Sequence, residues 1–144
     1  MIKEEGDKYW ENRKGEFTKE KMKNYRDGKY REAPQVPREK QINLLQEIKW
    51  ICRKHDTDVK IIISPDYLQV NINHADVKTL KRFFGKRNVF DFTGINEYTE
   101  DIHNYYEPGH YRPALGKRLM EKIYEPYILS PNAKSPASPS PGTI

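Results

Sequence analysis

The feature that most constrains the fold of this chain is a regular alternation of helical and strand-like patterns in its middle. Helical patterns cover residues 38–55 and 74–85, and they are followed by two short apolar runs, DVKIIIS (58–64) and NVFDF (88–92). Strands that alternate with helices favour an α/β fold whose neighbouring strands are parallel. The sequence therefore predicts a short parallel sheet covered by helices, with its first, nearly continuous apolar strand buried on both faces.

The helical patterns also predict which side chains are buried and where two helices begin or end. The second helix is expected to end at Gly85, because glycine readily closes a helix. A third helix is expected to begin at Pro113, since proline is favoured at the first helical position. The residues expected on buried helix faces are Leu44, Leu45, Ile48, Ile51 and Cys52 in the first helix, Val77, Leu80 and Phe84 in the second, and Leu115, Leu119 and Ile123 in the third.

The chain divides into three parts of different character. Residues 1–37 are charged and rich in tyrosine, and are expected to form only short helical pieces near residues 17–26. Residues 38–127 form the α/β unit, and residues 128–144 are a proline- and serine-rich tail that is expected to be disordered. Because only two strands are evident, the sheet should keep an unpaired edge. We therefore expect an isolated chain that is weakly folded, self-associates through residues 58–63, or pairs with a separately encoded N-terminal half.

The distribution of charge along the chain limits the kinds of partner that the protein is expected to bind. The net charge is +5, but acidic residues dilute the basic ones along the chain, so nucleic-acid binding is not favoured. One stretch without acidic residues holds a basic cluster of Lys78, Lys81, Arg82, Lys86 and Arg87. This cluster is either a solvated helix face or a docking site for an anionic polymer.

Several other classes lack their sequence signals. No run approaches the ~18 apolar residues of a membrane span, and the charged N-terminus is not a signal peptide, so the localisation is left open. A single cysteine excludes an internal disulfide framework. Four scattered histidines do not have the spacing of a metal site, and no glycine-rich phosphate loop is present. No cofactor is therefore expected.

The candidate chemistry lies in the stretch YYEPGHYRPALG, residues 105–116. Ligands of parallel α/β sheets bind beyond the carboxyl ends of the strands, and this loop should reach that edge. Glu107 could bond one ring nitrogen of His110 across a turn at Pro108 and Gly109, which would leave the other nitrogen to accept a proton from a nucleophile. The alternative is a surface turn whose histidine only caps the next helix.

Four further residues could line the same edge of the sheet. Ser64 and Asp66 follow the first strand, Asp91 ends the second, and Asp101 lies in the loop before His110. Ser64 precedes a proline and lacks the glycines of a nucleophile elbow, so a turn-forming role competes with a catalytic one. Asp101 is expected to cap or brace its loop beside an exposed His103.

The stretch NVFDFTGINEYTEDIHNYYEPGHYRPALGKRLMEKIY (88–124) resembles the C-terminal part of SGNH (GDSL-like) hydrolases, in particular the bacterial cell-envelope branch with acyl-transfer proteins acting on surface polysaccharides. YEPGHYRP (106–113) resembles the acid–x–x–His block of that family, and KIIISPDY (60–67) resembles the strand and loop that precede it. The resemblance implies that His110 is the general base and that Glu107, in place of the usual Asp, orients it.

The resemblance covers residues 38–127 and implies the C-terminal half of a flavodoxin-like three-layer sandwich. The family's earlier blocks, which carry the Gly-Asp-Ser nucleophile, the oxyanion glycine and the asparagine, are absent from these 144 residues. The implied function is an SGNH-type ester hydrolase or O-acyltransferase, acting on an ester-bearing or polysaccharide substrate and inactive as this chain alone. The alternative is a non-enzymatic interaction module that binds an anionic polymer or a protein partner.

Overall fold

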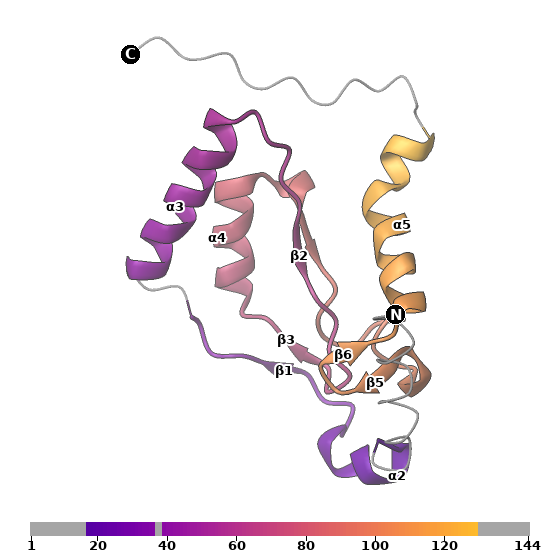
Figure 1. Ribbon diagram of the computed structural model, residues 1–144. Coiled ribbons are helices and arrows are strands. Elements are labelled where there is room, and N and C mark those ends of the chain that lie inside the picture. Colours follow the sequence, from indigo (N-terminus) through magenta and orange to yellow (C-terminus); the bar gives the residue numbers. More distant parts are fainter. Residues whose placement is uncertain (1–16, 37–38, 130–144) are drawn as a thin grey trace, which may run out of the picture.

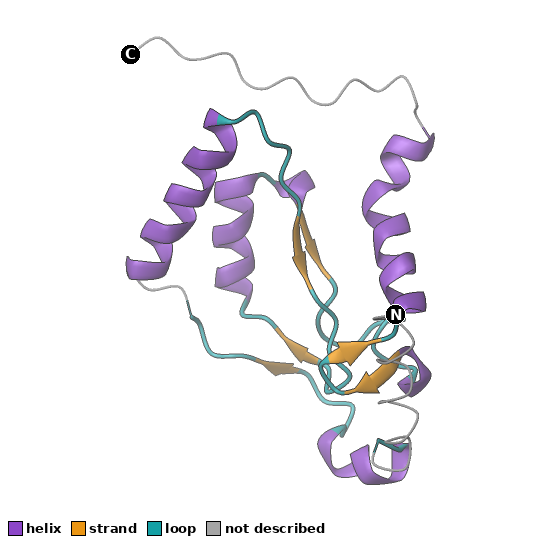
Figure 2. Ribbon diagram, viewed as in Figure 1, coloured by secondary structure: helices purple, strands orange, loops and turns teal. Residues whose placement is uncertain are grey.

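The computed structural model describes residues 17–36 and 39–129. Its helices are α2 (Lys19–Met22), α3 (Glu39–Lys54), α4 (His74–Phe84) and α5 (Pro113–Leu129), with 3-10 turns η1 (Lys23–Tyr25), η2 (Lys86–Asn88) and η3 (Ile102–Asn104). Its strands are β1 (Arg31–Glu32), β2 (Ile61–Ile63), β3 (Val70–Asn71), β4 (Val89–Asp91), β5 (Tyr105–Glu107) and β6 (His110–Tyr111). Figure 2 shows this mixture of helices and short strands, which agrees with the predicted α/β class.

The centre of the molecule is the parallel pair β2–β4, in which Ile61 lies opposite Val89 and Ile63 opposite Asp91. These are the two strands that the apolar runs predicted. Helices α3 and α4 lie on one side of the pair and α5 lies on the other (Figure 1). The chain leaves β2 and β4 at the end of the molecule where β5, β6 and the beginning of α5 lie (Figure 1).

The prediction of only two strands was wrong. Strand β1 pairs with β3 in parallel, and β5 pairs with β6 in an antiparallel hairpin. Strands β1, β3 and β6 contain only two residues each, which is too short for an alternating apolar pattern to reveal, and β5 (Tyr105–Glu107) lacks the apolar run that marks β2 and β4.

Residues 17–36 of the N-terminal segment are described and form part of the structure. It supplies the short helix α2, within the stretch where helical pieces were expected, and also supplies β1. Phe17 and Met22 pack against the buried core. The remainder of the segment, residues 1–16 and 37, lies outside the described residues, as does the predicted disordered tail beyond residue 129.

The predicted helix boundaries are confirmed at two places. Helix α4 ends at Phe84, and Gly85 follows it with φ +88°, a conformation that favours glycine. At its other end, the side chain of Asn73 caps α4 by accepting a hydrogen bond from the backbone N–H of Ala75 at 3.0 Å. Helix α5 begins at Pro113.

The hydrophobic core lies on the α5 side of the strands. Leu115, Leu119 and Ile123 are at most 2% exposed, so the predicted stripe of α5 is fully buried. They form a cluster with Tyr67, Phe92, Ile102 and Tyr105. Most of these partners come from the loops and the hairpin beyond the strands, rather than from the β2–β4 pair itself.

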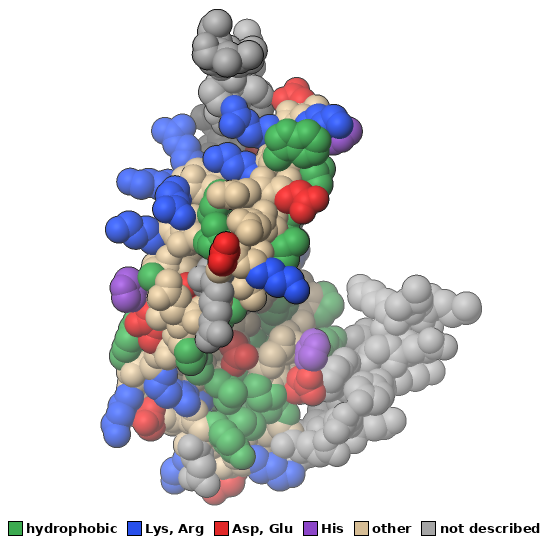
Figure 3. Space-filling model, turned by 90° about the vertical axis from the view of Figure 1, so that its left-hand side faces the viewer, with side chains coloured by type: hydrophobic (Ala, Val, Ile, Leu, Met, Phe, Trp, Pro, Cys, Tyr) green, Lys and Arg blue, Asp and Glu red, His purple; other side chains and the backbone are tan. Residues whose placement is uncertain are grey.

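The expected burial of the α3 face was wrong. Leu44, Ile48 and Ile51 are 44–50% exposed, and hydrophobic side chains are open to view among charged ones on this side of the molecule (Figure 3). The partly buried residues of α3 instead are Ile42, Leu45, Lys49 and Cys52, so Cys52 is not fully buried either. The reason is that α3 packs on α4, which covers a different face of it.

Strand β2 is likewise less covered than predicted, since Ile62 is 37% exposed. It pairs only with β4 among the described strands. None of the described helices is both long enough and apolar enough to cross a bilayer.

Candidate active site

The candidate site is the β5–β6 hairpin, whose two-residue turn is Pro108–Gly109. Glu107 and His110 face each other across this turn, and the Glu107 carboxylate is hydrogen-bonded to Nδ1 of His110. The predicted contact between these two side chains is therefore made. The His110 side chain keeps 68% of its surface exposed, so a reacting group can approach it.

Hydrogen bonds to backbone carbonyls hold the hairpin in place. The N–H of Tyr67, in the loop after β2, donates a hydrogen bond to the carbonyl of Pro108 at 2.9 Å. At the base of the hairpin, just before α5, the N–H of Arg112 donates to the carbonyl of Asn104 at 2.7 Å, and its Nε donates to the carbonyl of Tyr105 at 3.0 Å. The Glu107–His110 turn is therefore fixed between the end of β2 and the beginning of α5.

Asp66 lies beside the same turn. Its Oδ2 would be 4.0 Å from a Cβ atom placed on Gly109, and its Oδ1 accepts a hydrogen bond from the N–H of Leu68 at 2.6 Å. The phenol of Tyr105, which is 1% exposed, has a raised pKa because it is buried, and the charge of Asp66 adds to this effect. Asp66 is thus the one of the four additional candidates for which a described contact lies at the turn between Glu107 and His110.

Ser64 precedes this loop at the end of β2, and its side chain is exposed. Among the described residues, no hydrogen bond joins the Ser64 hydroxyl to His110. The following residue, Pro65, is fully buried. This placement fits the turn-forming role that was weighed against a catalytic one.

None of the described contacts joins Asp91 to the hairpin. Its carboxylate accepts hydrogen bonds from the N–H and Oγ1 of Thr93, at 3.0 and 2.7 Å. It also lines a hollow beside α4 that contains neither Glu107 nor His110. The loop after β2 thus reaches the hairpin, whereas the acid at the end of β4 is bonded within its own turn.

Asp101 caps the 3-10 turn η3, as the bracing role predicted. Its Oδ1 accepts hydrogen bonds from the N–H of His103 at 2.9 Å and lies 2.8 Å from Nδ1 of the same residue. Both bonds lower the pKa of Asp101 below its ordinary value, and the bond from the backbone N–H contributes most. His103 is exposed, also as predicted.

The fold contains a third carboxylate–histidine pair that the sequence did not suggest. Glu32 in β1 lies 2.8 Å from Nδ1 of His74 and accepts a hydrogen bond from its N–H at 2.6 Å. The two residues are 42 positions apart, so no local spacing could have indicated the contact. A hydrogen bond between a carboxylate and Nδ1 therefore occurs in three histidines of this surface. His110 differs from the other two because its turn is bonded to the loop that follows β2.

Among the residues that the structure describes, no group of three or more His, Cys, Asp or Glu side chains could hold a metal ion. Comparisons of this chain with protein-family models, with curated proteins and with solved structures found no match. The chemical interpretation of the site therefore depends on its geometry and on the residues themselves. A carboxylate that fixes one nitrogen of an exposed imidazole is suited to moving a proton.

Proposed function

We propose that residues 38–127 are the C-terminal part of a flavodoxin-like, three-layer SGNH-type domain that catalyses serine-mediated acyl transfer. The observation that carries this proposal is the hydrogen bond between Glu107 and Nδ1 of His110, in a hairpin held against the loop after β2. Helices on both sides of a parallel strand pair are consistent with such a domain (Figure 1). His110 is the general base in this proposal, and Glu107 is the residue that positions it.

In the proposed reaction, Nε2 of His110 takes the proton of a serine hydroxyl as the serine oxygen attacks the carbonyl carbon of an ester. The same proton then passes to the alcohol oxygen that leaves, so His110 returns to its neutral form. The carboxylate of Glu107 keeps the imidazole in the required tautomer and stabilises its protonated form. No metal or cofactor takes part in these steps.

The serine is assigned to a segment other than these 144 residues, because they contain no Gly-Asp-Ser block. Such a segment could be an N-terminal half of the domain, either in the same polypeptide or in a separate one. Strand β2 has an edge that no described strand pairs, and the apolar stripe of α3 is half exposed. Further strands and helices of an α/β domain would cover surfaces of this kind. The substrate class, an ester-bearing molecule such as an acylated polysaccharide, follows from the resemblance alone.

The reading frame upstream of Met1 gives the decisive test. We expect it, or a neighbouring frame, to encode on the order of 100–200 residues that include a Gly-Asp-Ser strand end. The combined protein should hydrolyse p-nitrophenyl acetate. The His110→Ala variant should then lower kcat/KM by about 10³-fold or more, and Glu107→Gln should lower kcat with little change in KM.

His103→Ala is the matched control, because His103 is also exposed and also bonded to a carboxylate through Nδ1. It should change the rate by less than about twofold if location, rather than pairing, gives His110 its role. A combined protein that keeps its rate after His110→Ala would disprove the proposal. An enzyme-like rate from the 144 residues alone that is lost in Ser64→Ala would instead place the nucleophile at Ser64.

A further inference from the structure

The outer face of α4 carries a group of exposed and partly buried cations. Lys78 and Arg82 are one helical turn apart on α4, and Lys86 begins η2 just beyond Gly85. Lys81 lies alongside them. Among the described residues, none of these four is in an ion pair, although Arg82 lies over the ring of Phe83 at 5.4 Å. The lysines of α5, by contrast, are paired with glutamates at Lys117–Glu121 and Lys122–Glu125.

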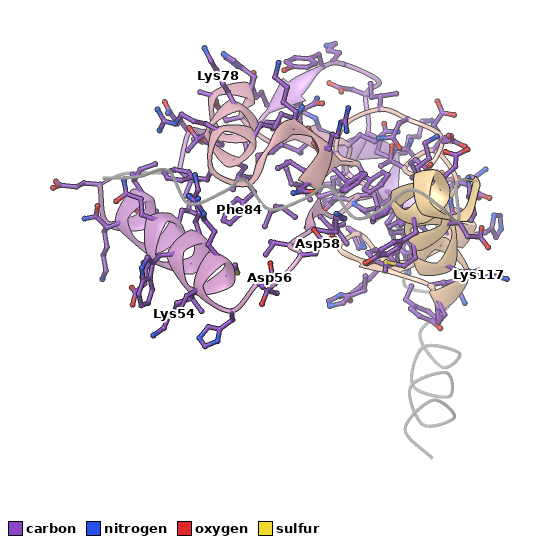
Figure 4. The ribbon with its side chains drawn as sticks, turned by 90° about the horizontal axis from the view of Figure 1, so that it is seen from above. Lys54, Asp56, Asp58, Lys78, Phe84 and Lys117 are labelled. Atoms are coloured by element: carbon purple, nitrogen blue, oxygen red, sulfur yellow. The ribbon has the colours of Figure 1, made fainter. Side chains whose placement is uncertain are left out.

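These four cations border one hollow of about 680 Å³. The remaining lining residues are Tyr30, Asn71, Ile72, His74, Val77, Thr79 and Asp91. In Figure 4, Lys78 points outward on the side of α4 that faces away from α3, whereas Phe84 points inward from the same helix. Figure 3 shows Lys and Arg side chains gathered along the corresponding edge of the molecule. The hollow is thus separate from the β5–β6 hairpin.

The acidic groups near the hollow are already engaged. Asp91 accepts its two hydrogen bonds from Thr93. Glu32 is bonded to His74 and to the hydroxyl of Tyr30, which donates to it at 3.0 Å. Four positive charges therefore surround a space in which Asp91 is the one negative charge among the lining residues. Like charges that border one hollow repel one another, so the site favours an anion of several charges.

We propose that this hollow is a binding site for a small molecule that carries two or more phosphate groups. A phosphate group bears about −1.5 to −2 charges at pH 7, roughly twice the charge of a carboxylate, so two of them match four cations within a small volume. Arginine binds phosphate with a two-pronged donor pattern, and lysine is a standard point-charge partner. Arg82 and the three lysines supply both kinds of contact.

The shape of the hollow favours a small ligand over a polymer. Its volume is within the range of about 300–1,000 Å³ that is usual for small-molecule sites. Ile72, Val77 and the ring of Tyr30 offer an apolar wall to the organic part of a ligand, and Asn71 and Thr79 offer hydrogen bonds. Proteins that bind single-stranded nucleic acid present several aromatic platforms along a basic groove, whereas Tyr30 is the one Phe, Tyr or Trp residue of this lining.

Isothermal titration calorimetry of the full chain with inorganic tripolyphosphate tests the proposal. We expect saturable binding at least about tenfold tighter than that of inorganic phosphate, with an affinity that falls as salt rises. The double variant Lys78→Gln/Arg82→Gln should weaken tripolyphosphate binding by about tenfold or more, since hydrogen bonds to charged groups are the strong ones. These side chains are exposed, so the fold should be kept, which circular dichroism checks.

Lys117→Gln/Lys122→Gln is the control, because it removes the same charge from α5. It should leave the affinity within about twofold, and His110→Ala should also leave it unchanged. Equal weakening by both double variants would mean a response to net charge alone and would overturn the proposal. Absence of saturable tripolyphosphate binding would also overturn it, as would heparin or an oligonucleotide that binds at α4 and is not displaced by tripolyphosphate.

Discussion

The two sides of the β2–β4 pair carry helices with similar apolar stripes, but only one stripe is buried. On α5, Leu119 is 2% exposed, whereas on α3, Ile48 is 45% exposed. The α5 stripe meets side chains from the hairpin, from the loop after β4 and from Phe17 in the N-terminal segment. The α3 stripe has no such layer among the described residues. The spacing of apolar residues thus shows which face of a helix can pack. Whether that face is buried depends on other segments of the chain lying against it.

The largest loss of stability is expected when a buried side chain of α5 is shortened. Leu119→Ala should lower the free energy of unfolding by about 2–5 kcal/mol, because it removes a buried side chain and leaves a cavity. Ile48→Ala, the matched change on α3, should cost less than about 1 kcal/mol, since much of that side chain is already in water. Urea denaturation measures both. Equal losses in the two variants would show that the α3 stripe is covered in solution, for instance by a second copy of the chain.

A smaller loss of stability should come from a change in the loop after β4, which contacts β3. Gly94 has φ +77°, and a Cβ atom there would lie 2.1 Å from Oδ1 of Asn71. The Asn71 side chain donates a hydrogen bond to the carbonyl of Arg31 at 2.9 Å, so it cannot move without losing this bond. Gly94→Ala should therefore cost about 1–3 kcal/mol, from backbone strain together with the lost bond.

Gly28→Ala separates these two causes. Gly28 also has a positive φ, of +70°, but nothing lies within 4 Å of its Cβ position. It should show the backbone strain alone, about 1 kcal/mol. Thermal melting measures both losses of stability. If Gly94→Ala lost no more stability than Gly28→Ala, the loop after β4 would be able to shift away from Asn71, and it would be less rigid than its contacts indicate.

The smallest effect should be a pH dependence of stability that comes from the contact between Glu32 and His74. Hydrogen bonds from the N–H of His74, from its ring and from Tyr30 lower the pKa of Glu32 below its usual 4.5. A carboxyl group with a lowered pKa in the folded state stabilises the fold fully above its ordinary pKa, and this contribution is lost as the pH falls through the lowered value. The Tm advantage of the natural chain over Glu32→Gln should therefore be constant above about pH 4.5 and shrink below it.

Leu119→Ala provides the contrast in the same melting series. Its loss of Tm should persist at every pH, because the burial of an apolar side chain does not titrate. A Glu32→Gln difference that also stayed constant down to pH 3 would show that the link between β1 and α4 does not depend on the ionised carboxylate.

Local features of the fold could be predicted from the sequence because neighbouring residues suffice to form them. Helix α4 ends at Gly85 and α5 begins at Pro113, since backbone conformation at these positions depends on the residues themselves. The Glu107–His110 contact belongs to the same class, because three residues and a Pro-Gly turn bring the two side chains together. The parallel pairing of β2 and β4 also followed, from the order of helices and strands.

The tertiary structure alone decided the contacts between distant parts of the chain. It paired β1 with β3, joined Glu32 to His74, placed Asp66 beside Gly109 and turned Asp91 toward the α4 hollow. It also decided that the stripe of α5 is buried while that of α3 remains half exposed. The physical reason is that burial and long-range hydrogen bonds depend on which segments meet in space. That choice balances apolar burial across the whole chain against the entropy lost in closing each loop.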